Sequence, residues 1–222
     1  MQVTDRIRHH ARELWLGRDV AVCYGAAVVG IGVALAIAPP EVAHRIVNHS
    51  STNLVNLRER PLSVLFASPF VIYPISGSWL VAPMVVAFGV LQRWLGRAGL
   101  IAVVVLGHVG ATLVVATMQV TSLTRGLIDF DVAVGPDVGI SYGLATVAGV
   151  LVARVPRTWR RRYLLASLAV VVGQGLVLRN FTGLGHVVAW VIGLAVALLV
   201  ARGARAVDQP VRQAGSLAAV ER

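Results

Sequence analysis

A serine and a histidine lie in this chain where a nucleophile and its base could act together. Ser141 is at the start of one strongly apolar segment, and His186 is at the start of another. A serine hydroxyl is a weak nucleophile near neutral pH, and a histidine within hydrogen-bond reach accepts its proton during attack on a carbonyl. These residue types indicate hydrolytic chemistry at the ends of two apolar helices, provided that the fold brings them together.

The composition places these residues in a membrane protein. The chain has 222 residues, of which 57% are hydrophobic and 14% charged, and its mean hydropathy is +0.76. A soluble domain contains about a quarter charged residues. All twenty basic residues are arginine, and the net charge is +10. We assign this charge to the loops that flank membrane spans and expect no nucleic-acid partner.

Six apolar segments approach the roughly 20 residues that a helix needs to cross a bilayer. The run Leu62–Tyr73 is shorter and is interrupted by Pro69, so we expect it to lie in the membrane interface. The predicted spans are 20–38, 79–95, 98–119, 138–153, 163–178 and 184–201.

The distribution of arginine predicts the topology. With the N-terminus inside, fifteen arginines fall on cytoplasmic segments and five on external ones, as the positive-inside rule requires. We therefore expect an all-α, six-span integral protein of a bacterial plasma membrane with both termini cytoplasmic. Its predicted parts are a cytoplasmic segment 1–19, a membrane domain 20–201 with a long first loop 39–78, and a cytoplasmic polar tail 202–222.

This topology places Ser141 and His186 at the same depth, because the fourth and sixth spans both run inward from the outer surface. Small residues also recur at four-residue spacing on both spans, which lets membrane helices approach closely. The small residues expected at this contact are Gly139, Gly143, Ala145 and Gly149 on the fourth span, and Gly185, Ala189, Gly193 and Ala197 on the sixth.

Ser141 and His186 could also have purely structural roles. A serine in a membrane helix commonly bonds a backbone carbonyl, and a histidine near the interface commonly contacts headgroups or water. His108, near the middle of the third span, is a candidate functional group because it is ionisable, but we prefer a neutral histidine bonded to a neighbouring helix. Asn180 either caps the sixth span or lines the site. The single cysteine, Cys23, excludes an internal disulfide and a cysteine-based metal site.

The segments around Ser141 and His186 resemble those of the rhomboids, a family of intramembrane serine proteases. Gly139-Ile140-Ser141 is similar to the family's Gly-x-Ser nucleophile motif, and His186 followed by Ala189 and Gly193 is similar to its histidine motif. The stretch 91–97 also resembles the family's Glu-x-x-x-Gly-x-Arg, and the likeness covers residues 20–200. It implies a six-helix fold with Ser141 as nucleophile and His186 as base. It also implies transmembrane protein substrates cut near the outer leaflet, and neither metal nor cofactor.

The sequence departs from the rhomboid pattern at three places. Gln92 replaces an acidic residue, Tyr142 follows the serine where glycine is typical, and the His-x-x-x-Asn of the second span is missing. The oxyanion would then depend on backbone amides near Gly139 and Tyr142, or on His108 or Asn180. A rhomboid-like pseudoprotease that binds transmembrane clients without cutting them therefore stays open. A small transporter or a subunit of a larger complex is a third possibility, and the oligomeric state is open.

Overall fold

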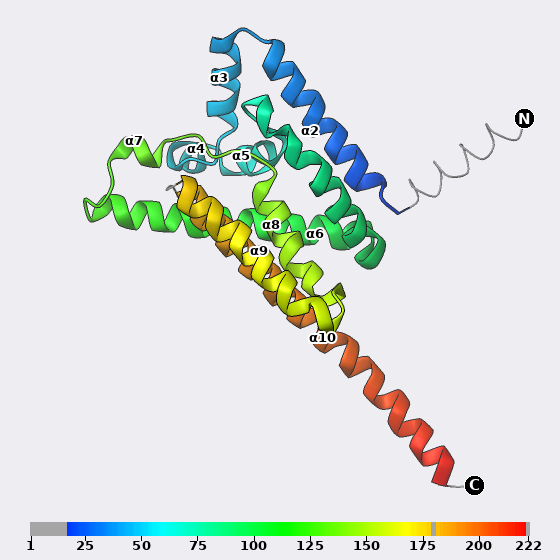
Figure 1. The fold of residues 1–222 in the computed structure, drawn as a ribbon. Coiled ribbons are helices and arrows are strands. Elements are labelled where there is room, and N and C mark those ends of the chain that lie inside the picture. Colours follow the sequence, from blue (N-terminus) through cyan, green and yellow to red (C-terminus); the bar gives the residue numbers. More distant parts are fainter. Residues whose placement is uncertain (1–16, 179–180, 221–222) are drawn as a thin grey trace, which may run out of the picture.

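The computed structural model describes residues 17–178 and 181–220, and in these residues it is helical with no strand (Figure 1). Short helices fill the predicted first loop, and four longer stretches of helix form the body of the molecule. The elements are α2 (Asp19–Ile37), α3 (Pro40–Ser50), α4 (Leu54–Glu59), α5 (Pro61–Ala67), η1 (Ser68–Phe70), η2 (Ile75–Leu80), α6 (Val81–Thr124), α7 (Phe130–Ala133), α8 (Ser141–Leu151), η3 (Val152–Arg154), α9 (Arg157–Leu178) and α10 (Phe181–Val220).

Three helical stretches of the described chain are long and apolar enough to cross a membrane by themselves. They are Asp19–Ile37, Ile75–Thr124 and Phe181–Arg202, and Ser141–Arg154 is a shorter apolar helix. The predicted fourth, fifth and sixth spans correspond to α8 with η3, to α9 and to α10. α10 continues past the predicted end of the sixth span at residue 201, through most of the segment predicted as a polar tail.

α6 contains the predicted second and third spans, which meet at Gly96. The backbone of Gly96 has φ 78° and ψ 177°, a conformation open to glycine because it has no Cβ. Beside this turn, the Gln92 side chain accepts a hydrogen bond from Ala21 N–H at 3.1 Å and donates one to Asp19 at 2.6 Å. Gln92 therefore satisfies an amide of the first turn of α2, which no helical carbonyl can reach.

The first loop folds as α3, α4, α5, η1 and η2, and the helical part of Leu62–Tyr73 is formed by α5 and η1, which end at Phe70. Three hydrogen bonds to backbone carbonyls join this loop to the segment that precedes α8. Thr52 N–H donates to Asp137 O at 3.0 Å, Gly139 N–H donates to Ser68 O at 2.9 Å, and the Asn53 amide donates to Val134 O at 3.1 Å. These bonds hold the first loop over the start of α8.

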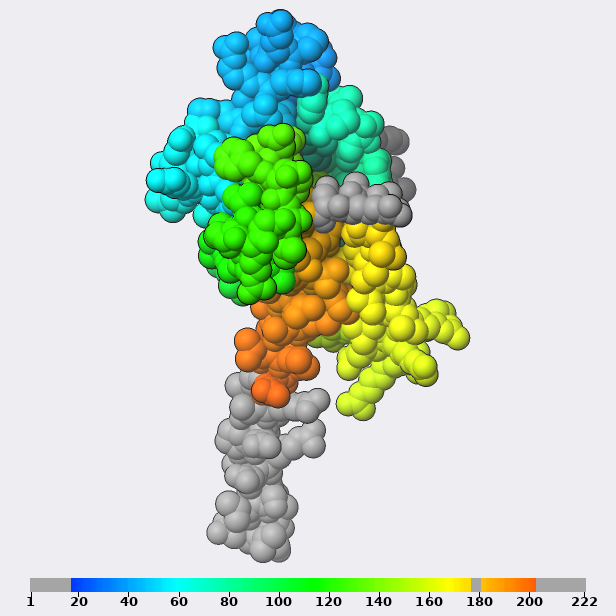
Figure 2. Space-filling view, turned by 90° about the vertical axis from the view of Figure 1, so that its left-hand side faces the viewer, coloured from blue at the N-terminus to red at the C-terminus, as the bar shows by residue number. Residues whose placement is uncertain are grey.

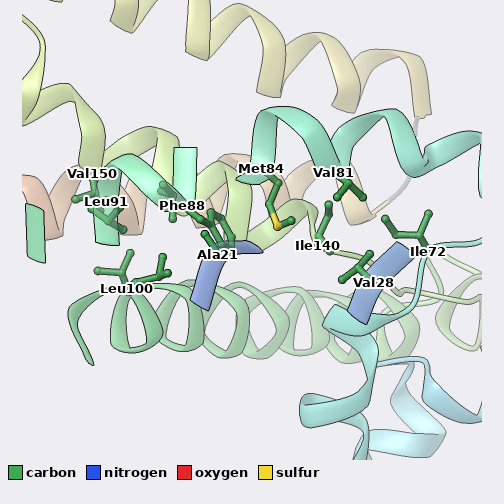
Figure 3. Close-up of a cluster of buried hydrophobic side chains, with 12 residues drawn as sticks. Ala21, Val28, Ile72, Val81, Met84, Phe88, Leu91, Leu100, Ile140 and Val150 are labelled. Carbon is green, nitrogen blue, oxygen red and sulfur yellow. The ribbon is translucent and has the colours of Figure 1, made fainter. Parts of the chain in front are cut away.

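The core joins α2, both halves of α6 and α8. Phe88 and Met84 of α6 belong to the same buried cluster as Val28 of α2 and Ile140 at the start of α8 (Figure 3). α9 and α10 lie side by side at the edge of the body (Figure 2, yellow and orange). α8 packs against both α6 and α10.

Candidate active site

Ser141 is the first residue of α8 and lies on the wall of a cavity of about 290 Å³. The other walls are formed by the loop 72–80 and by residues 138–140. The cap position, Ile140, makes no side-chain capping bond. The amides at the start of a helix have no helical acceptor, so the first turn of α8 offers backbone donors beside the serine.

Gly139 creates the turn that directs the chain into α8. Its φ of 132° lies in a region that side chains with a Cβ rarely adopt. Its N–H is bonded to Ser68 O, so η1 of the first loop holds this turn in place. The Gly-x-Ser spacing is therefore required by backbone geometry, because glycine is needed two residues before the helix begins.

His186 is almost completely buried near the start of α10, with 4% of its surface exposed. Neither ring nitrogen has a hydrogen-bond partner among the described residues. The Ser141–His186 hydrogen bond that a dyad needs is thus not formed in this structure. Buried polar atoms without partners are uncommon in native proteins and call for an explanation.

Tyr142, rather than Ser141, makes the observed contact with His186. The two rings pack edge to face with centroids 5.3 Å apart, and His108 lies near the tyrosine ring at 6.1 Å. The contact requires glycine at position 185, because a Cβ there would lie 2.3 Å from the tyrosine hydroxyl. Tyr142, the residue that follows the serine, therefore packs against α10.

Asp137 is a central residue of the site that the sequence analysis did not select. Its carboxylate accepts hydrogen bonds from the hydroxyls of Tyr142 at 3.0 Å, Thr182 at 3.2 Å and Thr52 at 3.4 Å. These donors belong to α8, α10 and the first loop, so one carboxylate joins three segments. The available sequence signal was an acidic residue two positions before the Gly-x-Ser motif.

The Asp137 carboxylate gives the site a predicted pH dependence. Burial raises its pKa, and the bonds from Tyr142, Thr182 and Thr52 oppose that rise. The folded state then binds this proton more tightly than the unfolded state, whose pKa is about 3.9. Stability from this group is greatest below that value and falls as the pH rises through the folded pKa.

Asp137→Asn should remove this loss of stability at higher pH. The measurement is the melting temperature of wild type and variant in detergent across about pH 4–8. The wild-type value should drop relative to the variant as the pH rises. Asp131→Asn, at an exposed carboxylate of the same connection, should follow the wild-type curve. Parallel curves for wild type and Asp137→Asn would show that the carboxylate is not destabilised by burial.

His108 is buried and its Nε2 lies 3.0 Å from the Ser68 hydroxyl. It is therefore bonded to a neighbouring helix, which is the interpretation that we preferred, and its neighbour in the site is Tyr142. Ser68 is fully buried, so its hydroxyl is not accessible to a substrate. Asn180 lies outside the described residues.

The small residues of α8 and α10 form a close backbone contact. A Cβ on Gly149 would lie 2.4 Å from Trp190 O, and one on Gly193 would lie 2.1 Å from Thr146 O. Ala189 is fully buried in the same contact. Gly143 differs from the expectation: its missing Cβ faces Val104 of α6, because it lies on another side of α8.

In the described part of the chain, no group of three or more His, Cys, Asp or Glu side chains is arranged to hold a metal ion. The fold and the site define a helical integral membrane protein with a serine and a buried histidine on adjacent helices. The rhomboid-like protein family matches residues 9–206, and the chain belongs to that family. The resemblance inferred from the motifs around Ser141 and His186 is thereby confirmed. No curated protein and no solved structure matches the chain.

Proposed function

We propose that this protein is an intramembrane serine protease in which Ser141 is the nucleophile and His186 is the base. Ser141 supports the proposal most strongly, because it lies at the uncapped start of α8 on the wall of a cavity. His186 supports it as a buried imidazole on the helix that packs against α8, with no hydrogen-bond partner among the residues that the structure describes. The proposal includes six spans with both termini cytoplasmic, in a bacterial plasma membrane.

The reaction would follow the chemistry of other serine hydrolases. Ser141 Oγ attacks the peptide carbonyl while His186 accepts the hydroxyl proton, and the imidazolium then protonates the leaving amine. Water hydrolyses the acyl-enzyme with the same base. The developing oxyanion would be bound by amides of the first turn of α8, since the half of α6 before Gly96 contains neither histidine nor asparagine. Each lost side-chain donor costs about 2.7–4 kcal/mol of transition-state stabilisation.

The catalytic step would require Ser141 and His186 to approach each other when substrate binds. Catalytic hydrogen bonds are often long in empty sites and shorten in the substrate complex. A substrate peptide entering beside the loop 72–80 would reach Ser141 first. It must be unwound there, because a helical backbone keeps its carbonyls in internal hydrogen bonds. The favoured substrates are therefore transmembrane segments with helix-breaking residues near the outer leaflet.

A pseudoprotease that binds transmembrane clients is the second candidate, and one observation favours it. Tyr142 occupies the contact with His186 and is held there by the bond from its hydroxyl to Asp137. If this arrangement persists when a client binds, the imidazole cannot receive the serine proton.

A fluorophosphonate probe separates the two candidates, because it reacts only with an activated serine. Wild type in detergent should be labelled, and Ser141→Ala should not be. Ser68→Ala is the matched control, since Ser68 forms a buried hydrogen bond to His108, and it should label like wild type. Absence of labelling under conditions that label a known rhomboid protease would favour the pseudoprotease.

A further inference from the structure

A second and larger cavity lies away from Ser141, between α2, the α5–η1 segment and the second half of α6. Its volume is about 540 Å³, and its walls are formed mostly by apolar side chains, among them Cys23, Ala27, Leu65 and Val104. Phe66, Ile101 and Val105 line it and are each at least half exposed. In a membrane this cavity would open sideways to the hydrocarbon region.

Two polar groups beside this cavity are bonded within the chain. The Tyr24 hydroxyl donates to Pro69 O at 2.6 Å, and His108 Nε2 lies 3.0 Å from the Ser68 hydroxyl, whereas His108 Nδ1 has no partner among the described residues. A cavity with such walls offers a ligand little hydrogen bonding and favours a hydrocarbon occupant, since apolar cavities exclude water.

One end of the cavity carries positive charge. Asp19 lines this end, and Arg97 Nε donates to both of its carboxylate oxygens at 2.9 and 3.2 Å. The Arg97 side chain is nevertheless 71% exposed. Its terminal amino groups make no hydrogen bond to the rest of the described chain. Arg93, one turn earlier, is also exposed, and Arg18 precedes Asp19. Three arginines beside one aspartate leave a net positive charge at this end.

We propose that this cavity binds an acyl chain of an anionic phospholipid whose phosphate is held by Arg97. The apolar walls contact the acyl chain, and the exposed Arg97 guanidinium complements the charge of the phosphate. Arginine binds phosphate through geometrically matched donors, and one arginine near a membrane surface contributes about 1 kcal/mol to binding anionic lipid. The site is independent of the proposed protease activity.

Native mass spectrometry of the full chain tests this site directly. Wild type titrated with phosphatidylglycerol in detergent should retain one lipid more tightly than phosphatidylcholine. Arg97→Gln should weaken phosphatidylglycerol binding about fivefold and bring the two lipids to similar affinity. Ala27→Trp, which fills the cavity, should abolish retention, whereas Val29→Trp, at a 42% exposed position outside the lining, should not.

Cys23 provides a second readout, because it is the single thiol of the chain and lines the cavity. Phosphatidylglycerol should slow its alkylation in wild type and in Val29→Trp, and inorganic phosphate alone should not. If phosphatidylglycerol protects Cys23 equally well in Arg97→Gln, or not at all in wild type, the site is refuted. Protection that increases with protein concentration instead of lipid would identify the cavity as a contact between copies of the chain and overturn the proposal.

Discussion

His186→Ala is expected to lower the rate of peptide-bond cleavage by a factor of about 10²–10⁴, the usual contribution of a general base. Ser141→Ala should reduce it to the background, because alanine has no hydroxyl to attack the carbonyl. The measurement is kcat/KM for a reporter substrate with one transmembrane segment in liposomes. His186 makes no hydrogen bond in the described structure, so its loss removes little beyond its packing against Tyr142.

His108→Ala is the matched control for this prediction. Both histidines are buried and both lie beside Tyr142, but only His108 is bonded to Ser68. The control should retain most of the cleavage activity although it loses a structural hydrogen bond, which typically contributes about 0.5–1.5 kcal/mol. An equal loss of activity in the two variants, at equal melting temperatures, would show that His186 has no special role as the base.

Gly149→Ala should destabilise the protein by about 1–3 kcal/mol, the usual cost of overpacking a close contact. The new Cβ would lie 2.4 Å from Trp190 O and 2.9 Å from Leu194 N, both backbone atoms of α10. Backbone atoms cannot move away as a flexible side chain can, so α8 and α10 must separate. The measurement is the free energy of unfolding in detergent, or the melting temperature.

Gly30→Ala in α2 is the control, because no atom of the described part of the chain lies within 4 Å of its added Cβ. It should leave stability unchanged or raise it by about 0.4–1 kcal/mol, as alanine does where its conformation is allowed. If the Gly149→Ala and Gly30→Ala variants have the same melting temperature, the close approach of α8 and α10 is not a source of stability.

The general architecture was accessible from the sequence because it depends on local properties. Runs of apolar residues predicted the helical segments, and the Gly96-Arg97 interruption predicted the break within α6. Leu62–Tyr73 was expected to be too short to span, and its helical part ends at Phe70; its position in the membrane interface stays a prediction. The spacing of Gly185, Ala189 and Gly193 predicted close helix packing, which the structure shows between α10 and α8.

The network around Asp137 was not accessible, because it joins residues that are far apart in the chain. Thr52 and Thr182 reach the Asp137 carboxylate from the first loop and from α10. Neither contact leaves a periodic pattern in the sequence. An aspartate in a loop is normally solvated, so its residue type alone gives no reason to expect three hydroxyl donors.

The sequence by itself determined that this is a membrane protein with a serine and a histidine at the starts of two apolar helices. Only the tertiary structure decided which side chain beside the histidine makes the contact. Successive residues of a helix differ by about 100° in direction, so the rotation of α8 decides whether Ser141 or Tyr142 packs against His186. The turn at Gly139 and the glycine contact with α10 set that rotation. They bring Tyr142 to His186 and leave Ser141 at the cavity.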